Sequence, residues 1–196
     1  MRYFKVLPKV VYTNPKGYSS ILTNISVRAQ IIPKVLDNPL LYYKYSIKDD
    51  DTPEIIADKY YGNSYYYWAI LIVNEMQHPI WSWPMATNVF NDFIENKYGE
   101  QKNDIYYYEK IITKTNLYTE EITEERIKIN EDAYNELVPS DINVEIGDDY
   151  LNIVTTKREV SYYVYEDELN ESKRLIKVLD SKYISTLELE YKNLFK

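Results

Sequence analysis

The sequence has no cysteine, a single histidine and only four glycines among its 196 residues. Without cysteine the chain forms no disulfide bond and no thiolate metal site, so cysteine usage does not reveal a redox compartment. The one histidine, His78, has no second histidine with which to hold a metal ion, and we expect it to be structural. The few glycines include no glycine-rich loop of the kind that cradles phosphate groups.

Long apolar runs are also absent. The longest, residues 65–73, is far shorter than the ~20 residues that a helix needs to cross a bilayer. The N-terminal residues include charges but no apolar stretch typical of a secretory signal. The net charge is −8 and no basic face is visible, whereas phosphate contacts need clustered Lys and Arg. We therefore expect a soluble protein made inside the cell, with no nucleic-acid partner and no membrane insertion.

Signs of catalysis are missing as well. Acidic residues cluster at 49–51, 120–121 and 124–125, but no spacing holds two carboxylates across a cleft as glycosidases require. We interpret these clusters as solvated loops. Residues 49–51 lack the glycine and the distal glutamate of a calcium loop, and no serine lies in a nucleophile elbow. The sequence predicts no enzyme activity, no catalytic residue, no cofactor and no metal ion.

Tyrosine, by contrast, is abundant. It occurs 23 times, with clusters at 42–45, 65–67, 106–108 and 162–165. Neighbouring tyrosines on a strand point to opposite faces, so they cannot all reach one core. For any one cluster, amphipathic filler or a codon bias explains the composition equally well, but for all four together a protein partner is the better interpretation. The candidate interface tyrosines are Tyr42, Tyr66, Tyr107 and Tyr163.

The most regular pattern lies between residues 41 and 74. Apolar and polar residues alternate over 41–48, which indicates a half-buried strand. Asp51 and Thr52 then offer oxygens for a helix start before Pro53, and Gly62 ends that helix. A second helix is predicted over about residues 64–73, with Asn74 as its polar stop and with Trp68, Leu71 and Ile72 on one face.

This strand–helix–helix segment resembles a LysM module. The residues that carry the resemblance are Asp51, Thr52, Ile56, Ala57, Tyr61, Gly62, Trp68 and Asn74. Asp50 stands where such modules usually have glycine, and the stretch from Ala57 to Asn74 is longer than in carbohydrate-binding modules. Both departures concern the loops that hold sugar in those modules.

Two further tryptophans follow the segment. We predict that residues 80–83 form a second short strand, on which Trp81 and Trp83 share a face. The flanking prolines, Pro79 and Pro84, favour an edge position for that strand. An edge with two tryptophans suits either sugar stacking or docking of another chain, whereas Trp68 is expected in the core.

The remaining pattern predicts an α+β fold. We expect a small LysM-like βααβ core with a following helix (41–99), an extended N-terminal arm interrupted at Pro33 (1–40), and a mixed α/β C-terminal region (100–196). Further predictions are a strand over 3–12, a helix over 87–98, strands over 105–113, 160–165 and 175–179, a loop-rich stretch over 120–135, and a final helix over 181–195 capped by Ser181.

Most of the chain resembles one family. The stretch TPEIIADKYYGNSYYYWAILIVNEMQHPIWSWPM, the following TNVFNDFIENKYG and both chain ends are similar to the baseplate wedge protein 53 family of T4-like contractile-tailed phages. The resemblance implies a structural component of a tail baseplate that joins neighbouring wedge subunits around the central hub. It implies six copies per baseplate, assembled in the host cytoplasm. The implied partners are core-bundle wedge subunits, a lysozyme-like wedge protein and hub or tube-initiator proteins.

The alternative function belongs to a different class. A LysM-type module would bind N-acetylglucosamine polymers such as peptidoglycan or chitin. It would need an open groove between the loop at residues 50–53 and the loop at residues 74–79. The absence of a secretory signal counts against this alternative.

Overall fold

The computed structural model describes residues 3–27, 29–31, 38–78, 80–147 and 149–195. Helices and strands are mixed in an α+β fold, as predicted. The chain forms two compact units: residues 1–87 with 170–196 (unit 1), and residues 88–169 (unit 2). The two units have other limits than the predicted boundaries at 40 and 99. A division into compact units does not test the predicted three regions, which stay a prediction. Pro33 lies outside the described residues, and none of the described helices is long and apolar enough to cross a membrane.

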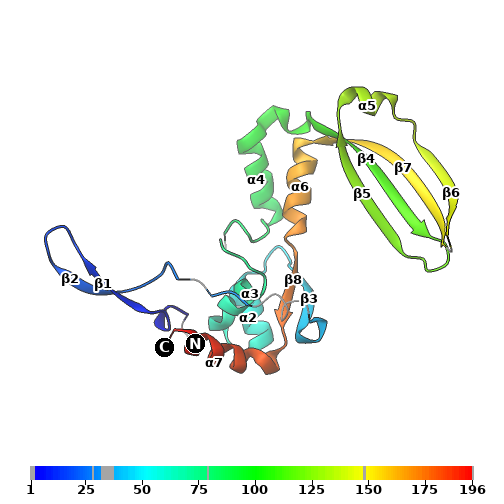
Figure 1. The fold of residues 1–196 in the computed structure, drawn as a ribbon. Coiled ribbons are helices and arrows are strands. Elements are labelled where there is room, and N and C mark those ends of the chain that lie inside the picture. The colour runs from blue at the N-terminus through cyan, green and yellow to red at the C-terminus, as the bar shows by residue number, and fades with distance from the viewer. Residues whose placement is uncertain (1–2, 28, 32–37, 79, 148, 196) are drawn as a thin grey trace. The chain divides into compact units, whose positions relative to one another are not determined.

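Unit 1 is built around a two-stranded antiparallel sheet. β3 (Tyr42–Ser46) pairs with β8 (Leu175–Leu179), so the predicted strands at both places are confirmed. The helices α2 (Pro53–Tyr61) and α3 (Tyr67–Val73) complete a βααβ arrangement (Figure 1). Its buried residues are Ile47, Ile56, Ala57, Ile70, Ile176 and Val178.

The predicted strand over residues 80–83 is wrong. The described residues of this stretch form turns and bends, and β8 supplies the strand that pairs with β3. The prediction took the nearest β-like stretch in sequence, but β8 offers a run in which Ile176, Val178 and Leu179 are all buried. Burial of that apolar run favours the distant strand over the nearby segment, which exposes Ile80 and Trp81.

Local chemistry explains where α2 begins and ends. The Thr52 Oγ1 accepts a hydrogen bond of 3.3 Å from the Ile55 amide, and Pro53 occupies the first turn. Gly62 adopts a left-handed φ of +66° and donates its amide to the Asp58 carbonyl. The predicted second helix is also confirmed, although it starts as a 3-10 turn, η3 (Ser64–Tyr66).

The N-terminal part of unit 1 contains a β-hairpin. β1 (Lys9–Thr13) pairs antiparallel with β2 (Ser19–Thr23), after a 3-10 turn, η1 (Tyr3–Lys5). The predicted strand thus begins six residues later than expected, at Lys9 rather than at Tyr3. A further 3-10 turn, η2 (Pro39–Leu41), leads into β3.

The predicted final helix is confirmed as η5 (Ser181–Tyr183) followed by α7 (Ile184–Leu194). Its cap is Asp180 rather than Ser181, because the Asp180 Oδ1 accepts the Lys182 amide. Tyr191 is buried against Trp68 and joins Leu7 and Ala69 in a second core cluster. Leu189 and Leu194 of this helix are exposed.

Unit 2 contains a four-stranded antiparallel sheet with the order β5-β4-β7-β6. Its strands are β4 (Ile105–Asn116), β5 (Ile122–Ile129), β6 (Ser140–Ile146) and β7 (Asp149–Ser161), and a short helix, α5 (Glu131–Glu136), lies between β5 and β6. The predicted strand at 105–113 is confirmed, but the predicted loop at 120–135 is wrong. Nearly every position of β5 is exposed, so its sequence lacks the apolar alternation of a half-buried strand.

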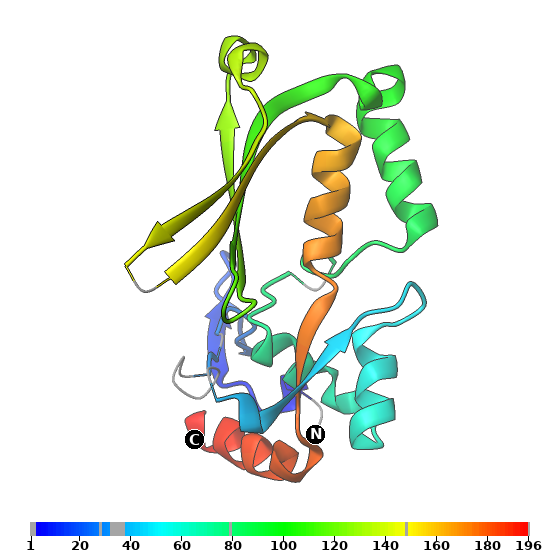
Figure 2. The same cartoon turned by 90° about the vertical axis from the view of Figure 1, so that its right-hand side faces the viewer.

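Two helices accompany this sheet. α4 (Thr87–Tyr98) was predicted and continues into a 3-10 turn, η4 (Gly99–Asn103), whereas α6 (Tyr162–Ser172) occupies most of the stretch predicted as a strand. The two helices lie side by side in Figures 1 and 2, and Tyr98 stacks on Tyr162 at 4.8 Å between ring centroids. Ser161 accepts the Val164 amide through its Oγ, a helix-start signal that the aromatic run concealed.

Candidate protein-interaction site

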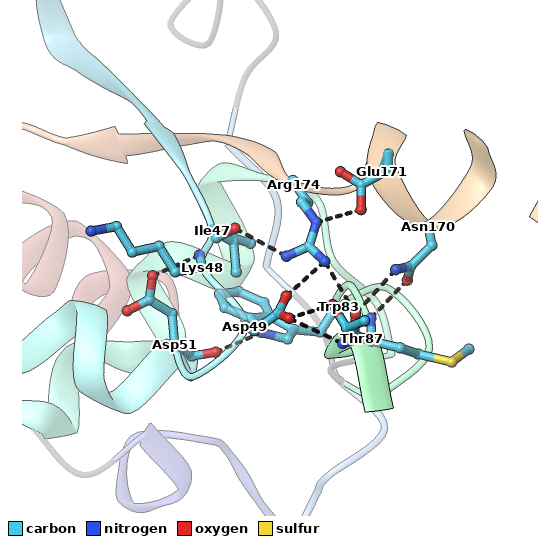
Figure 3. A network of polar contacts seen from close by, with 10 residues as sticks. Ile47, Lys48, Asp49, Asp51, Trp83, Thr87, Asn170, Glu171 and Arg174 are labelled. Carbon is cyan, nitrogen blue, oxygen red and sulfur yellow. Dashed lines mark hydrogen bonds and ion pairs between the residues drawn. The ribbon is translucent and has the colours of Figure 1, made fainter. Parts of the chain in front are cut away.

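The loop between β3 and α2 is held by Asp51. Its Oδ2 accepts hydrogen bonds from the Tyr45 hydroxyl at 2.7 Å and the Lys48 amide at 2.9 Å. The hydrogen bond to Asp51 raises the pKa of Tyr45 to about 12. Because this carboxylate already has two donors within the chain, it is part of the scaffold of the loop. Figure 3 shows its contact with Lys48.

A second carboxylate of this loop joins three segments. The Asp49 Oδ2 accepts from the Thr87 hydroxyl at 2.5 Å and from the Thr87 amide at 3.2 Å, and its Oδ1 pairs with Arg174 at 2.8 Å (Figure 3). The Thr87 side chain, the Thr87 amide and Arg174 lower the pKa of Asp49 below its usual value. Asp49 therefore stays ionised and connects the β3–α2 loop to residues on both sides of unit 2 in the sequence.

Arg174 and Asn170 extend this network. The guanidinium of Arg174 also binds Glu171 at 2.6 Å and the Ile47 carbonyl at 3.2 Å. The buried Asn170 side chain accepts from the Met85 amide at 2.7 Å and donates to the Met85 carbonyl at 3.0 Å (Figure 3). Both backbone groups of Met85 are therefore satisfied by one amide side chain, which fixes the course of the segment before α4.

Trp83 belongs to this scaffold. Its indole Nε1 donates to the Asp51 carbonyl at 3.0 Å, and its ring packs against the βααβ core. Trp81, two residues earlier, is 69% exposed. The two tryptophans were predicted to share one face of a strand. Instead they lie in a turn, one packed inward and the other exposed to solvent.

Asn74 ends α3, as predicted, and its side chain also binds β8. Its Nδ2 donates to the Ile70 carbonyl at 2.9 Å and to the Lys177 carbonyl at 2.7 Å, while its Oδ1 accepts the Lys177 amide at 2.8 Å. One side chain thus caps the helix and binds both backbone groups of a residue in β8. This contact couples the second helix of the core to its second strand.

An open cavity of about 400 Å³ lies beside Asn74. Its lining includes Trp81, Ser82, Lys173 and the β8 residues Leu175 and Ile176. Trp81 and Leu175 on its lining are exposed by 69% and 63%, and Ile80, which precedes Trp81 in the sequence, by 80%. Large contiguous apolar patches on a protein surface are typical of sites for a ligand or a protein partner. We refer to Ile80, Trp81 and Leu175 as the Trp81 patch.

The other residues of the LysM-like motif have structural positions. Ile56, Ala57 and Trp68 are fully or almost fully buried. Tyr61 packs against both core clusters of unit 1, and burial raises its pKa. The motif residues therefore lie in the core or cap its helices, and the solvent-facing surface of the unit is formed mainly by other side chains.

The candidate interface tyrosines are engaged within the chain to different degrees. Tyr42 and Tyr66 are half-buried, and the Tyr66 hydroxyl donates to Glu188 at 2.8 Å. Half-buried Tyr107 lies under Lys128, whose Nζ is 4.0 Å from its ring centroid. Tyr163 is 36% exposed and meets Phe90 edge-to-face at 5.7 Å. Their use as an interface stays a prediction.

Unit 2 contains its own charged network. The carboxylate of Glu109 is only 3% exposed and accepts a hydrogen bond from Arg158. Arg158 also binds Glu168 at 2.6 Å, and Glu168 binds Arg126 at 3.2 Å. The buried charge is therefore paired, which makes it a structural group. Within the described residues, no group of three or more acidic or histidine side chains is placed to hold a metal ion.

Sequence reasoning missed the roles of Arg174 and Asn170. Both act on residues more than 80 positions away, and neither lies in a local motif that marks such a role. It also missed how exposed the β1–β2 hairpin is. The sequence carried no signal for that exposure, because apolar residues of the hairpin occur on both faces of each strand, a pattern typical of a buried strand.

The comparison with known families now identifies the class of protein. A family model of phage structural proteins matches residues 19–193, which is most of the chain, so this is a baseplate component of a phage tail. The matching description is base plate wedge protein 53, and the chain belongs to that family. The family implies a place in the virion's baseplate and contacts with other baseplate components. No curated protein matches the chain.

Proposed function

We propose that this protein joins neighbouring wedge subunits around the central hub of a contractile tail, with the βααβ part of unit 1 as a LysM-like core. Membership of the wedge family supports the role in general. The observation that carries the finer proposal is the Trp81 patch, an apolar surface mounted on a tightly bonded scaffold. Preorganised apolar anchors of this kind contribute most of the binding energy in protein interfaces.

The scaffold also argues for protein docking over sugar binding. The polar groups of the β3–α2 loop are bonded inside the chain: Asp51 to Tyr45 and Lys48, and its carbonyl to Trp83. A sugar site needs polar groups free to bind hydroxyls. We infer that the LysM-like core here provides rigidity, and that its ligand is another baseplate subunit.

The proposed partners are the core-bundle wedge subunits and the lysozyme-like wedge protein, with six copies of this chain per baseplate assembled in the host cytoplasm. The test is to mix the purified protein with purified wedge intermediates and follow sedimentation. A larger species is expected, and its absence would refute the proposal.

Substitution of Trp81 tests the surface itself. Trp81→Ala should weaken binding to the wedge intermediate by about 30-fold or more, as expected for a tryptophan anchor. Its melting temperature should change little because the side chain is mostly exposed. Tyr118→Ala, which removes a 73% exposed aromatic ring from unit 2, is the matched control and should bind normally.

Glycan binding is a second candidate because the cavity of about 400 Å³ lies beside an exposed indole, a surface on which sugar rings stack. It is tested by a pull-down on insoluble peptidoglycan. Retention that soluble oligosaccharide competes away, and that Trp81→Ala abolishes, would support it. Retention that soluble sugar does not affect would count against it.

A further inference from the structure

Charge is distributed very unevenly along this chain. The first 36 residues contain six basic residues and no acidic one: Arg2, Lys5, Lys9, Lys16, Arg28 and Lys34. Since the whole chain carries −8, residues 37–196 carry −14. The N-terminal segment that contains the hairpin is therefore a basic element on an acidic protein, and its charge is suited to an acidic surface.

The hairpin has unpaired backbone groups. Among the described residues its sheet consists of β1 and β2 alone. The amide of Asn14 bonds the Tyr18 carbonyl, and the amide of Asn24 bonds the Pro8 carbonyl. In an antiparallel pair the bonded positions alternate. The residues between them, Lys9, Val11 and Thr13, therefore direct their backbone N–H and C=O groups away from β2, along a free edge.

The hairpin side chains are also uncovered. All positions of β1 and all but one of β2 are exposed, among them Val11 and Ile21 at 66% and 74%. A two-stranded sheet is marginally stable in water, whereas three or more strands with a covered apolar face are stable. An added strand would supply both the missing backbone bonds and the cover.

The sheet of unit 2 offers an edge of the opposite charge. Of its two edge strands, β5 contains Arg126 and Lys128, but β6 contains no basic residue. β6 places Asp141, Asn143 and Glu145 on one face and the exposed Ile142 and Ile146 on the other. Among the described residues, neither acid of β6 forms an ion pair, and Lys9 bonds only the Thr23 hydroxyl, at 2.6 Å.

We propose that β1 of one copy pairs antiparallel with β6 of a second copy of this chain. In the proposed register, Val11 lies opposite Asn143 at the centre of the strand pair, and Lys9 then lies opposite Glu145. The same register puts Val10 and Tyr12 beside Val144 and Ile142 on one face. On the other face Lys9 and Thr13 lie beside Glu145 and Asp141, with Val11 beside Asn143 between them. The four-stranded sheet of the second copy thereby gains the two strands of the hairpin.

This contact joins two different surfaces, so in a pair of copies the first keeps a free β6 edge and the second keeps a free hairpin. Heterologous contacts of this kind continue from copy to copy and close into a ring where the rotation permits. The contact needs only copies of this chain, and it is therefore independent of binding to other wedge subunits.

Disulfide cross-linking tests the pairing. Because the native chain contains no cysteine, only the introduced cysteines can form a disulfide bond. Under mild oxidation, a mixture of Val11→Cys and Asn143→Cys proteins should give more disulfide-linked dimer than either variant alone. Ile21→Cys is the matched control, because it lies opposite Val11 in the hairpin but on β2. A mixture of Ile21→Cys with Asn143→Cys should give little dimer. No dimer with Val11→Cys, or an equal yield with Ile21→Cys, would overturn the proposal.

Charge reversal tests the complementarity. In low-salt sedimentation, Lys9→Glu should weaken self-association several-fold, and so should the double variant Asp141→Lys, Glu145→Lys. Mixing the two reversed proteins should restore association, because each basic strand then meets an acidic one. A protein that is monomeric at every concentration, or a mixture that restores nothing, would refute the contact. Neither result bears on the sedimentation test with wedge intermediates, so failure of this proposal and failure of the proposed function are distinguishable.

Discussion

At the residue scale, a few polar side chains connect segments that are far apart in sequence. Asn74 binds both backbone groups of Lys177, Asn170 binds both backbone groups of Met85, and Arg174 binds Asp49 and the Ile47 carbonyl. A hydrogen bond to a backbone group that is shielded from water, such as the carbonyl of buried Ile47, is costly to remove because the group left behind loses its partner. We therefore expect these three polar residues to contribute to the stability of unit 1, although polar side chains usually lie at the surface.

Asp49 gives this network a dependence on pH. Its pKa is lowered in the folded protein by Thr87 and then by Arg174, so its contribution to stability is present above the unfolded pKa of about 4 and is lost as pH falls through the folded value. Asp49→Asn should therefore be less stable than the wild type near neutral pH, and this difference should shrink in acid. Urea unfolding at several pH values measures it.

Asp50→Asn is the control for this measurement, because Asp50 is exposed and the described residues show no ion pair for it. A difference between wild type and Asp49→Asn that stays constant with pH would contradict the assigned role of the ionised carboxylate.

At the element scale, α2 shows how one helix face supports the core. Ile56 is fully buried in the βααβ cluster, whereas its neighbour Ile55 is 50% exposed. The helix was predictable because its cap, proline and closing glycine are local signals. The partner strand β8 was identified as a strand but not as the partner of β3, because pairing depends on contacts that sequence spacing does not encode.

The two isoleucines of α2 form a matched pair for a stability test. Ile56→Ala should lower the free energy of unfolding by about 2–5 kcal/mol, because it removes a buried side chain and leaves a cavity. Ile55→Ala should cost less than about 1 kcal/mol, since much of its side chain is already in water. Chemical denaturation measures both, and equal losses would show that α2 packs differently.

At the scale of the whole molecule, the chain leaves unit 1 at residue 87 and returns to it at residue 170. Each unit has buried residues of its own, such as Val178 in unit 1 and Val160 in unit 2, both fully buried. Compact units with separate cores commonly open separately, so local stability need not be uniform along the chain.

Native-state hydrogen exchange tests this division. Val160→Ala should lower the exchange free energies of unit 2 amides by about 2 kcal/mol, because a buried side chain is truncated. Amides of β3, α2 and β8 should keep their protection. A uniform loss across the chain would show that the two units unfold as one.

The helices α2, α4 and α7 could be predicted from their apolar periodicity, and α2 also from its local cap and closing glycine. The acidic, cysteine-free composition was likewise readable in the linear sequence. The pairing of β3 with β8, the helical state of residues 162–172 and the inward position of Trp83 were not. Each depends on a contact between distant segments, and burial against such a contact outweighs the local preference of the residues involved.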